Sequence, residues 1–435
     1  MKIVKEKSHS GWAARSWFLF FGSLRVQLSL CLIIGVFLPV AFYFFRDPSS
    51  LAINASAKSS LIAATLATTS GVIVVRKFGQ FPGTITASYI VPAFTASYSI
   101  AVAAILLARA PYSGSLLTVT FALTLMVRFA IGAMERRRDD MLYCLVPGGK
   151  IDRIRDDIGV ASIMLTRPAL PEFPGAIIVA DLHHEHTPEW ERVFATSALR
   201  GIGVYHYKQV WEARTGKVRI EHLSENSLGS LIPSNSYSSV KRLFDIVLTL
   251  VAVPLLLPVL LIAALLIRLD SPGPIFFRQE RIGYRGVSFN VIKFRTMRVS
   301  KQASSDAERI DDAITKDDDD RITRIGGFLR KTRIDELPQL INILRGEMSW
   351  IGPRPEACPL SQWYEREIPF YSYRHIVRPG ITGWAQVNQG HVAGISEVHD
   401  KLRYDFYYIK NFSMWIDIVI LFRTVWVVIR GIGAK

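Results

Sequence analysis

Two adjacent carboxylates, Asp335 and Glu336, stand in a stretch rich in basic residues. Arg333 precedes them, Arg354 follows them, and further basic residues flank the pair: Arg324, Arg330, Lys331 and Arg345. Adjacent residues on a helix point about 100° apart, so these acids do not form a pair on one helix face. One could take part in chemistry in a cleft while the other orients a metal or a base. The alternative is a plain helix start, where acids complement the helix dipole and Pro338 is tolerated.

The composition indicates a membrane protein with a preference for anions. The chain has 435 residues, enough for two or three domains, and half of them are hydrophobic, gathered in blocks long enough to cross a bilayer. A formal net charge of +15 suits an anionic membrane face, polyanionic substrates or nucleic acid. Zinc-finger spacing and basic sheets with stacking aromatics are missing from the sequence, so we do not predict nucleic-acid binding. Cys31, Cys144 and Cys358 form no CxxC pair and predict neither a disulfide framework nor a zinc site.

Four apolar segments predict four transmembrane helices within residues 1–139. They run from Arg25 to Phe45 and over about 59–75, 87–108 and 114–134. The main basic clusters are the N-terminal tail, Arg76-Lys77 and Arg136-Arg137-Arg138. Because basic residues accumulate on the cytoplasmic side, we expect both ends of this four-helix region to face the cytoplasm.

Residues 140–235 have the composition of a small soluble α/β domain followed by a linker. Residues 177–181 and 202–205 read as buried strands, and 188–200 as a helix. A histidine cluster lies between them: His183, His184 and His186, with Glu185. Such a cluster can coordinate a metal, but it is more typical of a solvated loop, and we assign no ligand there. The Ser-, Asn- and Pro-rich segment 224–239 is typical of a linker.

A further long apolar run, about 241–269, opens the last region of the chain, 236–435. Pro254 and Pro258 lie inside it and predict a kink, because proline removes a backbone hydrogen bond and clashes with the preceding turn. Basic residues flank both of its ends: Lys241, Arg242 and Arg268. Charge of this kind favours having both ends in the cytoplasm. A helix that enters one leaflet, breaks and returns satisfies both observations; a straight span is the alternative.

The rest of the chain predicts a basic strand and an amphipathic C-terminal helix. Alternation over 287–297 indicates a short strand that carries Lys293 and Arg295. The segment from Arg378 to Trp384 predicts a rigid turn. The apolar stretch from Phe412 to Ile432 reads as a helix that lies against the membrane or the protein.

Seven short motifs follow one another within residues 240–435. They are Lys241-Arg242-Leu243-Phe244-Asp245, Asp270-Ser271-Pro272-Gly273-Pro274, Gln279-Glu280-Arg281-Ile282-Gly283, Lys293-Phe294-Arg295-Thr296-Met297, Asp335-Glu336-Leu337-Pro338-Gln339-Leu340, Gly352-Pro353-Arg354-Pro355 and Arg378-Pro379-Gly380-Ile381-Thr382-Gly383-Trp384. In these motifs the chain resembles the bacterial sugar transferase family, the monotopic phosphoglycosyl transferases. With its four apolar N-terminal segments it is similar to the large members that initiate exopolysaccharide synthesis.

The resemblance implies a fold and a location. It implies a membrane protein of the bacterial inner membrane, with a catalytic domain on the cytoplasmic side and a re-entrant helix broken at Pro258. Many relatives have serine before that proline, and Leu257 stands here instead, so the break would depend on Pro254 as well. A homodimer is compatible with the sequence, and membrane phospholipids are expected contacts.

The resemblance also implies a reaction and its residues. A hexose-1-phosphate would pass from a UDP-sugar, with glucose or galactose expected, to undecaprenyl phosphate, and UMP would be released. Asp335 would be the nucleophile that forms a covalent phosphosugar intermediate, and Glu336 would help hold Mg²⁺ or tune Asp335. Phosphate contacts are expected first from Arg354, which stands between two prolines, and then from four further cations: Lys293, Arg295, Arg333 and Arg378. Asp405 matches a position near the family's site.

Two other classes of protein compete with an enzyme. A polytopic transporter or flippase for lipid-linked sugars would account for the apolar helices, but it would need ionisable residues within them, and Arg128 is the one placed well inside a block. A non-catalytic membrane scaffold would leave the intact Asp335-Glu336 pair without a role.

Overall fold

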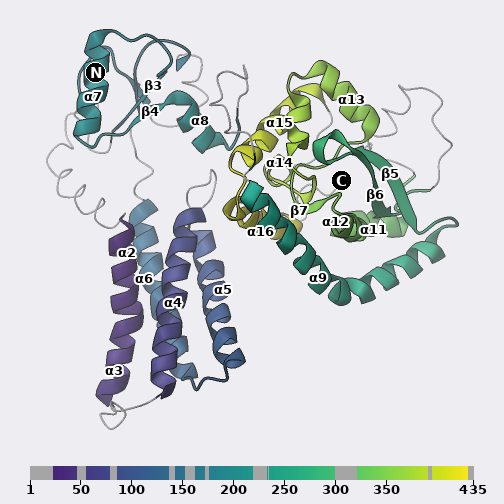
Figure 1. The fold of residues 1–435 in the computed structure, drawn as a ribbon, viewed down its shortest axis with the longest axis horizontal. Helices are drawn as coiled ribbons and strands as arrows, with labels where there is room; N and C mark the ends of the chain where they lie inside the picture. Colours follow the sequence, from purple (N-terminus) through teal and green to yellow (C-terminus); the bar gives the residue numbers. More distant parts are fainter. Residues whose placement is uncertain are drawn as a thin grey trace. The chain divides into compact units, whose positions relative to one another are not determined.

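The computed structural model describes residues 23–46, 55–78, 86–136, 143–151, 162–171, 176–218, 233, 235–298, 321–389 and 394–429. The chain divides into two compact units, Met1–Gly216 and Lys217–Lys435 (Figure 1). Most of the predicted linker and the basic N-terminal tail lie outside the described residues. The predicted division of the chain into three domains, with boundaries after residues 139 and 235, stays a prediction.

Long apolar helices form the first part of unit 1. They are α2 (Leu24–Leu32), continued by η1 (Ile33–Phe37) and α3 (Leu38–Arg46), then α4 (Ala55–Phe78), α5 (Thr86–Leu107) and α6 (Gly114–Arg136). On α4 the buried side carries small residues such as Ala64 and Ala67, whereas Ile62 and Leu66 on the other side are exposed. Small residues inside and large apolar residues outside suit helices packed together in lipid. All four stretches are long and apolar enough to cross a membrane, as predicted.

The second part of unit 1 is the small α/β fold that the sequence predicts. Its parallel strands lie in the order β2-β1-β3-β4 and carry two helices: β1 (Tyr143–Leu145), β2 (Ser162–Met164), β3 (Ile177–Ala180), β4 (Val204–His206), α7 (Pro188–Leu199) and α8 (Tyr207–Thr215). Ile178 packs in a cluster with Trp190 of α7, and Val179 in another with Trp211 of α8. Successive strand residues point to opposite faces, so both faces of the sheet are covered.

Unit 2 surrounds a two-stranded hairpin and a second pair of short parallel strands with helices. Its elements are α9 (Asn235–Asp270), β5 (Phe276–Ile282), η6 (Tyr284–Gly286), β6 (Ser288–Phe294), α11 (Arg324–Thr332), η7 (Ile334–Gln339), α12 (Leu340–Arg345), β7 (Ser349–Ile351), α13 (Cys358–Glu367), η8 (Tyr371–Ile376), β8 (Gly380–Thr382), α14 (Trp384–Asn388), α15 (Ile395–Lys410) and α16 (Met414–Ile429). Strands β5 and β6 pair antiparallel, and β7 and β8 pair parallel. The predicted strand at 287–297 is therefore β6, which includes Lys293 and ends just before Arg295.

Helix α9 is long, contains both prolines and changes direction along its length (Figure 1). Near its start Lys241 forms an ion pair with Asp417, at 2.5 Å. Near its end Ala263 packs in a core cluster with Phe294. Both halves of α9 are therefore attached to the same folded unit, while its other side exposes large apolar residues along the whole helix: Leu243, Leu250, Leu255, Leu261 and Leu265.

Helix α16 behaves as the sequence predicts for an amphipathic C-terminal helix. Ile416, Val419 and Ile420 are fully buried, whereas Leu421 and Trp426 are about half exposed. The buried side packs on the protein. The exposed apolar side is suited to a membrane surface.

Candidate active site

Asp335 and Glu336 lie in the first turn of the 3₁₀ helix η7, as the sequence places them near a helix start. Helix α11 ends at Thr332, and the next residue, Arg333, has a backbone in the left-handed conformation with φ of 60°. That reversal separates α11 from η7 and allows the two acids to begin a new turn. Pro338 is accommodated inside η7.

Glu336 is the centre of a buried cluster of charges. Its Oε1 atom accepts hydrogen bonds from Arg354, at 2.8 Å, and from Lys293 of β6, at 3.1 Å. The guanidinium of Arg333 lies 4.0 Å from the same oxygen. Burial alone would raise the pKa of Glu336, but the positive charges of Arg354 and Lys293 hold it well below its usual range. Glu336 is therefore ionised, and it holds two cations in place.

Asp335 lies beside this cluster and is only 9% exposed. Its Oδ1 atom is buried and has no hydrogen-bond partner among the described residues. Burial raises the pKa of Asp335, and the negative charge of Glu336 raises it further, against the opposing effect of Lys293. A buried carboxylate oxygen without a partner is energetically unfavourable, so it indicates a site built for a ligand.

Arg354 reaches Glu336 from a turn that follows strand β7. This turn passes very close to the start of β8, and two glycines make the approach possible. A Cβ atom on Gly352 would lie 2.3 Å from the carbonyl oxygen of Arg378, and one on Gly380 would lie 2.1 Å from the backbone nitrogen of Gly352. A side chain at either glycine would displace Arg354.

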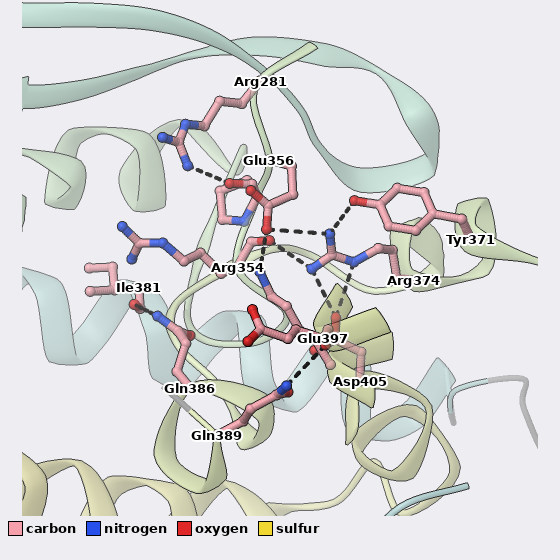
Figure 2. Close-up of polar contacts among 12 residues, drawn as sticks. Arg281, Arg354, Glu356, Tyr371, Arg374, Ile381, Gln386, Gln389, Glu397 and Asp405 are labelled. Carbon is pink, nitrogen blue, oxygen red and sulfur yellow. Dashed lines mark hydrogen bonds and ion pairs between the residues drawn. The ribbon is translucent and has the colours of Figure 1, made fainter. Parts of the chain in front are cut away.

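Arg374 holds the backbone of Arg354 in place (Figure 2). Its guanidinium donates to the carbonyl oxygen of Arg354, at 2.8 Å, and forms an ion pair with Asp405 of α15, also at 2.8 Å. It donates further to the hydroxyl of Tyr371, at 2.7 Å. Asp405 therefore acts on the candidate site through Arg374, which explains why a carboxylate on α15 matters near residues of η7.

A second buried carboxylate, Glu356, extends this network (Figure 2). It pairs with Lys401 of α15 and lies 3.9 Å from Arg374. Burial raises the pKa of Glu356, but Lys401 and Arg374 outweigh it and keep the pKa well below its usual range. Sequence reasoning missed Glu356, Arg374 and Lys401. Glu356 lies two residues after Arg354, Arg374 four before Arg378 and Lys401 four before Asp405. This closeness to predicted residues is the only signal in the sequence.

The remaining predicted phosphate-binding residues lie elsewhere in unit 2. Arg295 is buried and donates to the carbonyl oxygens of Ser271 and Pro272, at 2.7 and 2.9 Å. It thereby anchors the turn that follows α9. Arg378 donates to the carbonyl oxygen of Gly346, at 3.0 Å, and its guanidinium lies over the ring of Tyr284. The structure thus brings Asp335, Glu336, Lys293, Arg333 and Arg354 together, but neither Arg295 nor Arg378 joins them.

Comparisons with known proteins identify the family of the chain. Residues 236–431 match the family described as bacterial sugar transferase. Over 99% of both chains, the protein is 39% identical to a UDP-N-acetylgalactosamine-undecaprenyl-phosphate N-acetylgalactosaminephosphotransferase of Aeromonas hydrophila. The chain belongs to the bacterial sugar transferase family.

Other relatives of this sugar transferase match about half of the chain. A UDP-glucose:undecaprenyl-phosphate glucose-1-phosphate transferase of Xanthomonas campestris is 41% identical over 48% of this chain and 42% of its own length. An exopolysaccharide production protein of Rhizobium leguminosarum is 44% identical over 43% of this chain and 93% of its own length. The family match at residues 236–431 includes the candidate site, and the sugar in the names differs from one relative to another.

The predicted histidine cluster of this sugar transferase is partly assembled in unit 1. Asp181, His183 and His206 bring one ligand atom each within 4.8 Å of one another. However, Nδ1 of His206 accepts the backbone N–H of Lys208, so the proton of the neutral ring lies on Nε2, which faces His183 at 2.7 Å. Metal-bound histidines usually donate from the second nitrogen, so this arrangement favours a hydrogen-bonded cluster over a metal site.

Proposed function

We propose that this sugar transferase moves a sugar-1-phosphate from a UDP-sugar to undecaprenyl phosphate and releases UMP. One observation supports the proposal most strongly. Among the described residues, the buried Oδ1 atom of Asp335 has no hydrogen-bond partner, and it lies beside a cluster of cations that suits a diphosphate. A relative named for transfer to undecaprenyl phosphate matches 99% of the chain, and the family match at residues 236–431 contains the site. A role in initiating an exopolysaccharide or another surface glycan follows as part of the same proposal. Nothing in the comparisons supports a transporter.

The proposed chemistry has two displacements at phosphorus. Asp335 attacks the phosphorus that carries the sugar, the bond to the UMP oxygen breaks, and an aspartyl phosphosugar forms. The phosphate oxygen of undecaprenyl phosphate then attacks the same phosphorus, and Asp335 leaves as a carboxylate. Covalent catalysis of this kind divides one difficult step into two easier ones.

The neighbouring residues have distinct roles in this proposal. Glu336 keeps Arg354 and Lys293 beside Asp335, because both donate to its Oε1 atom. These cations, with Arg333, stabilise charge on the phosphate oxygens as the bond breaks. Arg374 and Asp405 position the backbone of Arg354 and do not touch the phosphate themselves.

A divalent metal is also part of the proposal. Mg²⁺ prefers carboxylate oxygens, and the Oδ1 atom of Asp335 fits that preference. Glu336 fits less well, since the oxygen it directs into the cluster is already shared by Arg354 and Lys293. When bound there, Mg²⁺ would neutralise the diphosphate and the departing UMP.

The membrane placement follows from α9. Since both halves of α9 attach to unit 2 and its other side exposes leucines, we propose that it enters one leaflet and returns. The candidate site would then lie at the cytoplasmic surface of the inner membrane. There it can meet a water-soluble donor and a lipid acceptor. The four helices of unit 1 would cross the membrane with both ends in the cytoplasm.

For the sugar we propose N-acetylgalactosamine in place of the glucose or galactose expected from the sequence. The relative named for N-acetylgalactosamine matches both halves of the chain, whereas the relatives named for glucose match half or less of it. UMP release from UDP-N-acetylgalactosamine, UDP-glucose and UDP-galactose, each with undecaprenyl phosphate, tests this choice.

The decisive experiment concerns Asp335. Purified enzyme is incubated with UDP-sugar labelled in the sugar-linked phosphate, without lipid acceptor, and the label is mapped by peptide mass spectrometry. We expect label on Asp335 and, for Asp335→Asn, loss of transfer by at least roughly a thousandfold. The matched control is Asp400→Asn, a partly exposed residue of α15. Near-normal turnover by Asp335→Asn, or label on another residue, would overturn the assignment.

A further inference from the structure

A second cationic site in unit 2 lies apart from Asp335. It is a cavity of about 200 Å³ between the start of α9, η6, the start of β7 and the segment after η8. Its basic lining residues are Lys241, Arg242, Arg285 and Arg378. None of the residues that form the Asp335 cluster lines this cavity, so it is a separate site within the described residues.

Three of the four cations in this cavity have no carboxylate partner in the described part of the chain. Lys241 is paired with Asp417. Arg242 instead donates to the carbonyl oxygens of Ile343 and Leu344, at the end of α12. One carboxylate, Asp245, also lines the cavity, and its side chain accepts from the hydroxyl of Ser349 and the backbone N–H of Trp350. The cavity therefore combines four cationic side chains with one carboxylate, which leaves an excess of positive charge.

Arg285 and Arg378 both contact the aromatic ring of Tyr284. Their guanidinium groups lie over Tyr284, at 5.0 and 4.8 Å from the ring centroid. Each guanidinium gains from the aromatic face of Tyr284, which fixes its position at the cavity. Guanidinium groups bind phosphate in a two-pronged geometry, so Arg242, Arg285 and Arg378 together suit a phosphate group.

The surroundings indicate an anion carried by a lipid. The cavity is smaller than the roughly 300–1,000 Å³ of pockets that enclose drug-sized ligands, so it suits a headgroup and not a whole nucleotide sugar. On the same turns of α9 that supply Lys241 and Arg242, Val240, Leu243 and Phe244 are 46%, 63% and 55% exposed. A charged pocket therefore adjoins an apolar surface.

We propose that this cavity binds the phosphate of a membrane lipid headgroup, with the hydrocarbon chains of the lipid against the exposed residues of α9. The proposal rests on the membrane placement of α9 proposed above. It does not depend on the transfer reaction. The same phosphate chemistry could come from a soluble anion, and the experiment separates the two sources.

The test measures binding to the full-length protein, freed of lipid in detergent, by native mass spectrometry. The probes are phosphatidylglycerol, diacylglycerol, which lacks phosphate, and inorganic phosphate. We expect phosphatidylglycerol to bind and diacylglycerol not to compete with it. Arg285→Gln should weaken phosphatidylglycerol binding about tenfold or more, because a hydrogen bond to a charged group is lost. Arg366→Gln, an exposed arginine on α13, is the matched control and should bind as the unchanged protein does.

Two further variants separate this site from folding and from catalysis. Arg242→Gln should weaken lipid binding to a similar extent. Arg285→Gln removes only a contact with the ring of Tyr284, so we expect that variant to keep the fold. Asp335→Asn should bind phosphatidylglycerol normally whether or not it is inactive. Equal lipid binding by all variants would overturn the proposal. A loss confined to inorganic phosphate would reject the lipid as the source of the anion.

Discussion

At the scale of single residues, Asp335 and Glu336 are adjacent acids with opposite environments. Glu336 shares one oxygen between Arg354 and Lys293, and its pKa is held well below the usual range. Asp335 has a buried oxygen without a partner in the described residues and a raised pKa. Carboxylates whose pKa values are pushed apart are suited to different tasks. Here one would organise cations and the other would react.

The raised pKa of Asp335 predicts a pH dependence. Only the ionised carboxylate can attack phosphorus, so transfer should fall as pH decreases through a pKa above the roughly 3.9 of an ordinary aspartate. Lys293 favours the ionised form, and Lys293→Met should therefore move the acid limb of the rate profile to higher pH. Kinetics of UMP release over a pH series measure this. Lys331→Met, an exposed lysine on α11, should leave the limb in place; an unmoved limb in Lys293→Met contradicts the prediction.

The pair formed by Arg374 and Asp405 predicts a loss of stability. Asp405→Ala leaves a buried guanidinium without its partner at 2.8 Å, and such a change lowers the free energy of unfolding by roughly 3–5 kcal/mol. Asp400→Ala removes a partly exposed carboxylate from the same helix and should lower it by about 0–1 kcal/mol. Denaturant unfolding followed by tryptophan fluorescence compares them. Similar values for both variants would show that the Asp405 pair does not hold the site.

The sequence predicts only in part which basic residues gather around the two acids. Lys293, Arg333 and Arg354 do meet at Glu336. Arg295 has the same charge and a similar motif, yet its guanidinium is taken up by carbonyl oxygens after α9. Whether an arginine remains available depends on backbone oxygens that only the folded chain brings near it. Arg374 was missed for the same reason.

At the scale of elements, long apolar helices were predictable because their signal extends over about twenty residues. The predicted segment 87–108 differs from α5 (Thr86–Leu107) by a single residue at each end. By contrast, η7 is one short turn whose geometry depends on the reversal at Arg333. Short elements carry too little periodicity to be placed, and tertiary contacts decide them.

The two prolines of α9 predict how the helix is inserted. Each lacks the N–H group that would bond to the residue four positions earlier. Replacing both Pro254 and Pro258 by alanine restores those donors and should favour a straight span, which places some molecules with unit 2 outside the cell. Accessibility of a C-terminal tag to protease in spheroplasts measures that fraction. Leu255→Ala keeps both prolines and is the control; full protection of the tag in the double variant would show that the prolines do not determine topology.

At the scale of the whole molecule, the chemistry and the long apolar bundle belong to different compact units. The charge cluster and its supporting network lie entirely within Lys217–Lys435. The relative from Rhizobium leguminosarum is matched over 93% of its own length by 43% of this chain, so a related protein of less than half this length exists. The bundle and the small α/β fold of unit 1 supply none of the residues that we assign to the reaction.

This separation predicts that unit 2 works alone. A truncated protein that consists of residues 217–435 keeps α9, its own exposed apolar surface and every residue of the proposed site. We therefore expect it to insert in membranes and to release UMP at a rate within about tenfold of the full-length rate. A tenfold difference corresponds to about 1.4 kcal/mol in activation free energy. Both proteins would be assayed at equal molarity in the same lipid nanodiscs. The control is that the full-length protein is active and its Asp335→Asn variant is not. If, in the same assay, the truncated protein has the circular dichroism of a folded protein but no transfer activity, unit 1 contributes to the reaction.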